Sequence, residues 1–337
     1  MNRNEKSGYS PLVFSEGNAA RLRESKLRVV VTGASRWLGQ ASLEMLESAL
    51  GDTLHSRVVA FASRARPLIL RSGREIALES LEDLPRLEPA PTLLLHYAFL
   101  GQDRALDIEA EEYVRRNAGI RKLVGEAMQQ IQVTHLLLSS SGAVYGLPTS
   151  ADRSLCPDPV RNPYGTQKIL DEEYFLGMSR ALGARMAIAR IFNISGPYIN
   201  KNGAYALYSL INAVLAGGPV ALLAARRVIR SYTSVRDLVD VSVGWLLRER
   251  QAETIVFDTG GDELVELGQL AQYVLELMDR VGMDIQRPGL GDGSGETDDT
   301  YVGDGRVFRS MADQQGVALA ALRSQIVETI EYLAAVD

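Results

Sequence analysis

The sequence predicts an α/β fold built on a doubly wound parallel sheet with a smaller second domain. Short apolar runs alternate with longer amphipathic segments through the first 200 residues, which is the sequence form of such a sheet. Two of these runs end in glycine or small hydroxyl residues, as buried parallel strands do where they enter a loop. At 337 residues the chain is longer than one compact core needs, and it suits a large domain with an appended one.

The apolar runs and amphipathic segments define the elements in chain order. We expect strands at residues 27–31, 58–62, 92–96, 135–139, 185–192 and 254–258. We expect helices at residues 38–50, 108–132 and 163–182. Residues 1–26 are polar and lack the apolar core of a signal peptide, so we expect a flexible extension there. Residues 282–305 are rich in glycine and aspartate and predict a mobile loop over the site.

The bulk composition excludes several classes of function. The formal net charge is −6 and no basic run stands out, which argues against a nucleic-acid-binding protein. No stretch reaches the length of a membrane span. Cys156 is the only cysteine and His55, His96 and His135 are scattered, so we expect no disulfide and no metal site. The sequence therefore predicts a cytoplasmic protein.

A tyrosine and a lysine four residues apart form the first candidate for chemistry. Tyr164 and Lys168 fall in an expected helix, so their side chains lie on one face. A free tyrosine has a pKa of about 10, and a nearby ammonium group favours the phenolate. The pair can therefore transfer a proton to or from a carbonyl or an alcohol.

Two loops that follow expected strands are further candidates for a ligand-binding site. The first strand enters Thr32-Gly33-Ala34-Ser35-Arg36-Trp37-Leu38-Gly39, a glycine turn followed by a helix, which is the context that a dinucleotide-binding turn requires. The fourth strand ends in Ser139-Ser140-Ser141-Gly142-Ala143-Val144-Tyr145-Gly146, at the edge of the sheet where α/β proteins bind ligands.

In this order and spacing, these segments closely resemble the extended short-chain dehydrogenase/reductase family, in its nucleotide-sugar epimerase, dehydratase and reductase branch. The resemblance runs from about Leu27 to the C-terminus. It implies a Rossmann domain over residues 27–195, to which residues 225–262 return. Residues 196–224 and 263–337 would form an interleaved substrate-binding domain. It also implies a homodimer formed through the helices at 108–132 and 163–182.

The resemblance assigns roles to individual residues. Tyr164 would exchange the hydroxyl proton, Lys168 would assist it and hold the nicotinamide ribose, and Ser141 would position the reacting oxygen. Gly142 and Ala143 stand where dehydratases carry Asp-Glu, so dehydration is not expected. The implied cofactor-binding residues are Gly33, Ser35, Arg36, Trp37, Leu38, Gly39, Ser63, Arg64, His96, Ala98, Ser139, Tyr164 and Lys168.

The cofactor turn departs from the family pattern. The family usually has Thr-Gly-x-x-Gly-x-x-Gly, and Arg36 takes the place of the middle glycine. The strand at 58–62 is followed by Ser63 and Arg64, with no carboxylate for a ribose 2′-hydroxyl. A guanidinium suits a 2′-phosphate, so Arg36 and Arg64 favour NADP over NAD.

The expected substrate residues lie further along the chain. Asn193 and Arg230 match family positions that contact the diphosphate of a nucleotide sugar. Relatives also carry an arginine shortly before Tyr301-Val302-Gly303-Asp304, and this chain has none in residues 294–299. One phosphate or base contact is therefore expected to be missing.

The resemblance implies an NAD(P)-dependent enzyme that transfers hydride at a ring carbon, C4, of a nucleotide-activated sugar. The arginines near the cofactor tilt the expectation toward an NADPH-dependent 4-ketosugar reductase, with an NAD-dependent 4-epimerase as the alternative. A non-catalytic nucleotide-binding scaffold is the alternative of another class: the altered glycine turn favours it, and the intact Ser-Tyr-Lys set opposes it.

Overall fold

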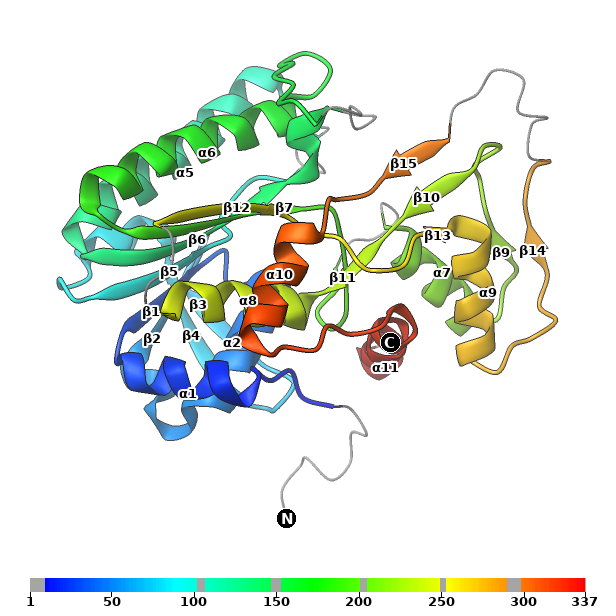
Figure 1. The fold of residues 1–337 in the computed structure, drawn as a ribbon, viewed down its shortest axis with the longest axis horizontal. Coiled ribbons are helices and arrows are strands. Elements are labelled where there is room, and N and C mark those ends of the chain that lie inside the picture. Colours follow the sequence, from blue (N-terminus) through cyan, green and yellow to red (C-terminus); the bar gives the residue numbers. More distant parts are fainter. Residues whose placement is uncertain are drawn as a thin grey trace.

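An eight-stranded sheet forms the centre of the larger part of the protein, as the computed structural model shows (Figure 1). Residues 10–101, 107–146, 153–200, 205–248, 253–289 and 298–336 are described. The strand order is β12-β7-β6-β5-β1-β2-β4-β3, and every neighbouring pair is parallel except β3 with β4. The predicted doubly wound parallel sheet is confirmed. Its strands are β1 (Arg28–Thr32), β2 (Val58–Ala62), β3 (Arg66–Ile69), β4 (Glu75–Ser80), β5 (Thr92–His96), β6 (Val133–Ser141), β7 (Arg185–Ile191) and β12 (Thr254–Asp258).

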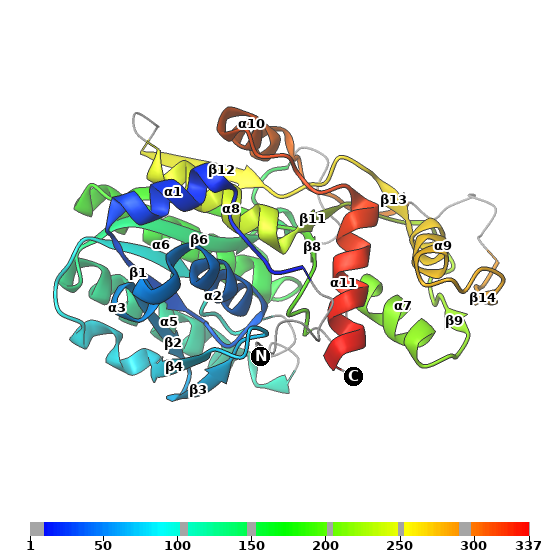
Figure 2. The same ribbon diagram turned by 90° about the horizontal axis from the view of Figure 1, so that it is seen from below.

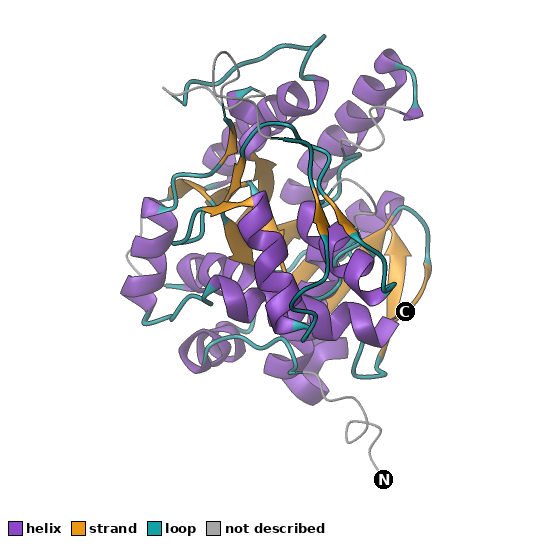
Figure 3. Ribbon diagram, turned by 90° about the vertical axis from the view of Figure 1, so that its right-hand side faces the viewer, coloured by secondary structure: helices purple, strands orange, loops and turns teal. Residues whose placement is uncertain are grey.

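Helices cover both faces of this sheet (Figures 1 and 3). Successive side chains of a strand point to opposite faces, so Val30 joins one apolar core while Val29 and Val31 join the other. The first core is completed by α5 (Ala110–Gln130) and α6 (Pro163–Leu182), and the second by α2 (Trp37–Leu50) and α8 (Val235–Leu247). Short helical segments connect these elements: η2 (Gly51–Thr53), α3 (Leu54–Arg57), η3 (Leu81–Arg86) and η4 (Gly142–Tyr145).

The smaller part of the described structure is built from short strands and the helices α7, α9 and α11. Its strands form one three-stranded sheet, β13-β10-β15, and two strand pairs, β14-β9 and β11-β8. Helix α11 lies between the two parts of the protein (Figure 2). The strands are β8 (Asn193–Ser195), β9 (Val220–Ala221), β10 (Val228–Arg230), β11 (Tyr232–Ser234), β13 (Val265–Glu266), β14 (Ile285–Gln286) and β15 (Asp299–Tyr301). Its helices are α7 (Ala206–Leu215), α9 (Leu267–Leu277) and α11 (Leu322–Val336). Helix α10 (Arg306–Gln315) packs instead on α8 and β12 of the larger part. The exact division of the chain into two domains stays a prediction.

The prediction of a flexible extension over residues 1–26 is wrong for its described part. Residues Glu16–Ser25 form helix α1, which packs on α2 and α8. Leu12 and Phe14 are buried, and the Asn18 Nδ2 donates to the Asp240 carbonyl and carboxylate at 3.1 and 2.8 Å. These contacts anchor a polar segment to a helix more than 200 residues away.

The loop expected at residues 282–305 also differs. Its described part contains β14 and β15, and β15 pairs in parallel with β10 beside the candidate site. Residues 290–297 lie outside the described part of the chain.

Candidate active site

A cleft of about 720 Å³ opens where the carboxyl ends of β1, β5, β6 and β7 meet the smaller part. This is the edge at which open α/β sheets bind ligands. Predicted residues from five segments line it: Arg36, Trp37, Leu38, Ser139, Ser141, Tyr164, Lys168, Asn193 and Arg230. The remaining predicted residues, Gly33, Ser35, Gly39, Ser63, Arg64, His96 and Ala98, are not in the described lining.

The first turn of α6 holds Tyr164 in place. Asn162 caps the helix by accepting from the Gly165 N–H at 3.0 Å, and Pro163 occupies the first helical position. The Asn162 Nδ2 also donates to the Ala143 carbonyl at 2.6 Å, which ties this turn to the segment that follows Ser141. The cap therefore fixes Tyr164 relative to the end of β6.

Lys168 lies one turn further along and is 4 % exposed. Its Nζ donates to the Ser139 carbonyl at 2.8 Å and lies 3.7 Å from the centroid of the Phe99 ring. Burial lowers the pKa of Lys168 from 10.5 to about 8, although Asp171 and Glu172 favour its charged form. Lys168 thus keeps its charge at neutral pH against a desolvation cost.

We expect the free energy of unfolding of Lys168→Met, compared with that of the wild type, to be most favourable below pH 8, where Lys168 is charged in the folded wild type. A pKa lowered from 10.5 to about 8 corresponds to roughly 3 kcal/mol of unfavourable free energy for the charged folded form. The folded state releases its proton before the unfolded state does, so the wild type should gain stability as pH rises from about 8 to 10. Urea unfolding at several pH values measures the difference between the two proteins. A difference that does not change with pH would contradict this account.

Ser141 ends β6, and its Oγ accepts from the Ala143 N–H at 3.2 Å. The Tyr301 side chain, which comes from β15, lies close enough to the Ser141 side chain for the serine to influence the pKa of the phenol. Burial raises the pKa of Tyr301, and the nearby Ser141 side chain opposes this, so the phenol stays protonated at neutral pH. Sequence reasoning noted Tyr301 only as part of a Tyr-x-x-Asp pattern and did not place it beside Ser141.

The glycine turn keeps its shape despite Arg36. Gly33 has a φ of +68°, and a Cβ there would lie 2.7 Å from the Tyr97 carbonyl carbon. A Cβ on Gly39 would lie 2.5 Å from the Ala34 Cα, so both glycines are required by the fold itself. Arg36 has a φ of −103°, which any residue adopts. Its substitution affects only how closely a ligand approaches the backbone.

The N-terminus of α2 fits the diphosphate of a dinucleotide. No side chain caps the helix by a hydrogen bond, and its first turn contains no acidic residue, so the helix itself offers its positive end no carboxylate. Arg36, Trp37 and Leu38 line the cleft at this helix end. Trp37 is buried, packs edge-on against Tyr205 at 5.5 Å, and its Nε1 has no partner among the described residues. Backbone N–H groups and a basic side chain thus converge where an anion would bind.

Three predicted neighbours of the cofactor lie outside the glycine turn and do not line the cleft. The His96 Nδ1 is hydrogen bonded to the Thr32 Oγ1 at 2.7 Å, and burial together with Lys168 lowers the pKa of His96 to about 3. His96 is therefore a neutral structural residue. Ser63 and Arg64 follow β2 and are exposed, so their contact with a cofactor stays a prediction.

Asn193 and Arg230 line the substrate side of the cleft. The Asn193 Nδ2 donates to the carbonyls of Ser231 and Tyr301 at 3.3 and 3.1 Å, so it clamps neighbouring strands. The Arg230 Nη1 donates to the Asp299 carbonyl at 2.8 Å and to its Oδ1 at 3.1 Å. The contacts of Arg230 with described residues all use Nη1, which leaves Nε and Nη2 for a ligand. Asp298 and Asp299 make this wall more acidic than the sequence alone indicated.

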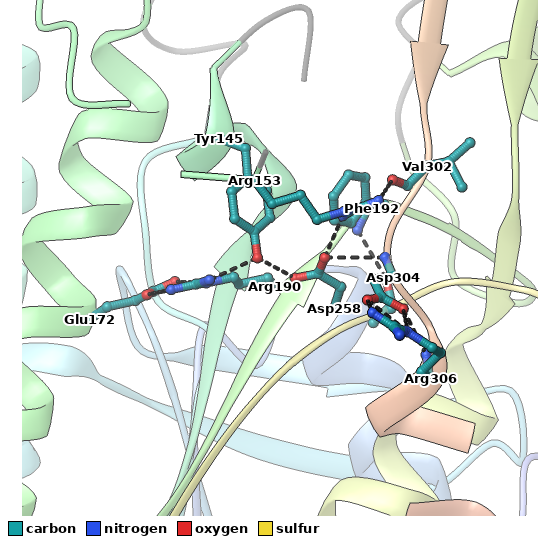
Figure 4. Close-up of polar contacts among 10 residues, drawn as sticks. Tyr145, Arg153, Glu172, Arg190, Phe192, Asp258, Val302, Asp304 and Arg306 are labelled. Carbon is teal, nitrogen blue, oxygen red and sulfur yellow. Dashed lines mark hydrogen bonds and ion pairs between the residues drawn. The ribbon is translucent and has the colours of Figure 1, made fainter. Parts of the chain in front are cut away.

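A buried polar network connects α6 with β7 and with the segments around Tyr145 and Asp258 (Figure 4). Arg190 of β7 forms a two-pronged pair with Glu172 of α6 at 3.0 and 2.7 Å. Its Nη1 donates to the Tyr145 hydroxyl at 2.7 Å, which in turn donates to the Asp258 Oδ1 at 2.7 Å. The other Asp258 oxygen accepts from Arg153 at 2.6 Å.

The same network reaches the segment that follows Tyr301. The Asp304 N–H donates to the Asp258 Oδ2 at 3.1 Å, and the Arg153 Nη2 donates to the Val302 carbonyl at 2.9 Å (Figure 4). The network therefore connects α6, which carries Tyr164 and Lys168, to the strand that places Tyr301 beside Ser141. None of these links was predicted from the sequence.

Comparison with known proteins agrees with this geometry. Residues 29–257, about two thirds of the chain, match the NAD dependent epimerase/dehydratase family. The chain belongs to this family. The predicted relationship to extended short-chain dehydrogenase/reductase enzymes is thereby confirmed.

Individual members of the NAD dependent epimerase/dehydratase family resemble the chain over most of its length. A dTDP-L-rhamnose 4-epimerase from Burkholderia thailandensis is 24% identical over 77% of this chain and 83% of its own. The structure of a UDP-N-acetylglucosamine 4-epimerase from Methanobrevibacter ruminantium M1 in complex with UDP-N-acetylmuramic acid covers 92% of this chain and 99% of its own, with a TM-score of 0.71 and 18% identity. A UDP-glucose 4-epimerase from Thermus thermophilus in complex with NAD covers 92% and 100%, with a TM-score of 0.68 and 19% identity.

These relatives are 4-epimerases, so the expected tilt toward a reductase finds no support among them. None of the helices within the described ranges is long and apolar enough to cross a membrane.

Proposed function

We propose that this family member is an NAD(P)-dependent nucleotide-sugar 4-epimerase. The observation that carries the proposal is the convergence of Ser141, Tyr164 and Lys168 on one wall of the cleft, with Arg230 on the substrate side. Three 4-epimerases among the similar proteins support the reaction type. Gly142 and Ala143 offer no acid or base for dehydration.

The chain's residues supply the proton chemistry of the reaction. A nicotinamide cofactor bound beside Tyr164 and Lys168 would supply the reversible hydride chemistry at C4 of the sugar. Tyr164 would take the proton of the C4 hydroxyl and give it back after the keto sugar has turned in the cleft, so no net oxidation occurs. Ser141 would hold the reacting oxygen by a hydrogen bond. The charge of Lys168 favours the phenolate form of Tyr164.

The finer proposal for the cofactor is NADP. Arg36 lies at the cleft and Arg64 follows β2 without an adjacent carboxylate, and both guanidinium groups suit a 2′-phosphate. An epimerase regenerates its cofactor in each cycle, so this selectivity does not decide between epimerase and reductase. A homodimer through α5 and α6 also stays a proposal.

A non-catalytic scaffold is the competing function. The altered glycine turn favoured it, but Arg36 does not strain the backbone and leaves the α2 N-terminus uncapped. Burial of the charged Lys168 costs free energy, and a non-catalytic scaffold has no proton transfer for which that charge would be needed. We therefore retain the enzyme proposal.

Arg230→Ala should weaken binding of a nucleoside diphosphate at least several-fold. The variant removes a charged donor that β10 and Asp299 hold at the cleft, and hydrogen bonds to charged groups contribute about 1.5–3 kcal/mol each. Calorimetry with UDP and dTDP on the cofactor-loaded protein measures the change. Arg227→Ala is a matched control, because Arg227 is close in sequence, more exposed, and outside the cleft lining. If UDP, dTDP, CDP and GDP all fail to bind the wild type, the proposed substrate class is wrong.

A further inference from the structure

Phe99 stands between the catalytic pair and the cofactor side of the cleft. No role was predicted for this residue from the sequence. Phe99 follows β5, is half-buried, and lines the cleft together with Tyr164 and Lys168.

The ring contacts both members of the pair. The Lys168 Nζ lies 3.7 Å from the ring centroid, a cation–π contact with a desolvated ammonium. The Tyr164 ring meets Phe99 edge to face, with centroids 5.6 Å apart and an interplanar angle of 81°. With the Ser139 carbonyl bound as well, the ammonium is enclosed, and Lys168 is only 4 % exposed. The ring thus covers part of the approach from the cleft to the Lys168 ammonium.

The backbone on both sides of Phe99 is anchored. The Leu100 N–H donates to the Asn117 Oδ1 and the Leu100 carbonyl accepts from the Tyr113 hydroxyl, both at 2.9 Å. On the other side, the Tyr97 N–H donates to the Thr32 carbonyl at 3.2 Å. A movement of the ring would therefore have to come from rotation of the Phe99 side chain, because the backbone on both sides is held in place.

We propose that Phe99 is a gate on the cofactor side of the cleft, which closes over Lys168 and rotates away when a dinucleotide binds. This inference rests on the proposed function, because the gate has a purpose only if a nicotinamide cofactor uses Lys168. The closed ring holds the lysine in position before binding. It also lowers the apparent affinity for the dinucleotide, because only the open fraction of the protein can bind it.

The test compares wild type, Phe99→Ala and Phe99→Leu by fluorescence titration with NADH and NADPH. If the ring is open in about a tenth of the molecules, the Ala variant should bind roughly tenfold more tightly. The Leu variant keeps much of the bulk but lacks the π face, so its affinity should lie between the two. Leu223→Ala, which truncates a 90 % exposed leucine outside the cleft lining, should bind like the wild type. Thermal melting of each protein checks that it is folded.

The outcomes separate the gate from the proposed function. Tighter binding by both Phe99 variants, in the expected order, supports the gate. If the wild type binds NADH or NADPH and Phe99→Ala binds it equally or more weakly, the gate is wrong and the proposed function stands. If none of the three proteins binds either dinucleotide, both fall.

Discussion

Tyr164→Phe should lower the turnover number by roughly 10²–10⁴-fold, the range that a positioned general acid or base contributes. The variant keeps the ring, so the edge-to-face contact with Phe99 and the cap of α6 should persist. It removes only the hydroxyl that exchanges a proton with the sugar. Dinucleotide affinity should therefore change little, which separates a chemical defect from a folding defect.

The measurement uses a nucleotide sugar that the wild type converts, with turnover and dinucleotide binding determined on the same preparations. Tyr273→Phe serves as the matched control, since Tyr273 lies on α9 outside the cleft lining and its hydroxyl bonds Glu263. An unimpaired rate for Tyr164→Phe would rule out this residue as the acid and base.

Arg190→Leu should be the most destabilising of the substitutions considered. The Glu172 side chain is 7% exposed, and without Arg190 its buried charge would lose its ion-pair partner and keep only the Ser140 hydroxyl as a hydrogen-bond donor. Removing one partner of a buried ion pair costs about 3–5 kcal/mol. The change would also leave the Tyr145 hydroxyl without a donor, and that hydroxyl connects the pair to Asp258.

Urea unfolding of Arg190→Leu and Arg323→Leu gives the comparison. The Arg323–Glu276 pair has side chains 47% and 48% exposed, and such surface pairs contribute only about 0–1 kcal/mol. The double variant Arg190→Leu/Glu172→Leu should recover part of the loss, because it leaves no unpaired charge. Equal costs for the two arginine substitutions would contradict the role of the buried network.

Much of the Rossmann part was predictable because its signals are local. The strands β2 and β5 occupy the expected residues, since uniformly apolar runs of strand length have few alternatives in an α/β chain. Helix α6 also begins and ends as expected, because Asn162 and Pro163 begin it and Gly183, with a φ of 64°, ends it. Because this helix was predicted correctly, the placement of Tyr164 and Lys168 one turn apart was predicted as well.

Other elements lacked local signals. Helix α1 buries only Asn18, Ala19 and Leu22, and its anchor is Asp240, more than 200 residues away, so composition alone indicated a mobile tail. The hairpin of β3 and β4 lies at the sheet edge, where β3 is mostly exposed and contains only the short apolar run that begins at Pro67. The alternation of buried and exposed residues in β4 was the available signal.

The sequence predicted which residues line the site more fully than it predicted which residues contact one another there. Ser141, Tyr164, Lys168, Asn193 and Arg230 meet in one cleft, whereas the positions of Phe99, Tyr301 and Asp299 against them depend on side-chain packing between distant segments. A motif gives the identity of a residue, and the tertiary fold decides which neighbour it contacts.

Proton NMR of nucleotide sugars incubated with the protein and catalytic amounts of NAD or NADP tests the central claim most directly. The account predicts that one UDP- or dTDP-sugar converts to a mixture of its two C4 epimers, while the amounts of oxidised and reduced cofactor stay constant. A C4-keto sugar reduced only with stoichiometric consumption of NADPH would show a reductase instead. Failure to invert C4 in any UDP- or dTDP-sugar supplied with either cofactor would contradict the proposed epimerase.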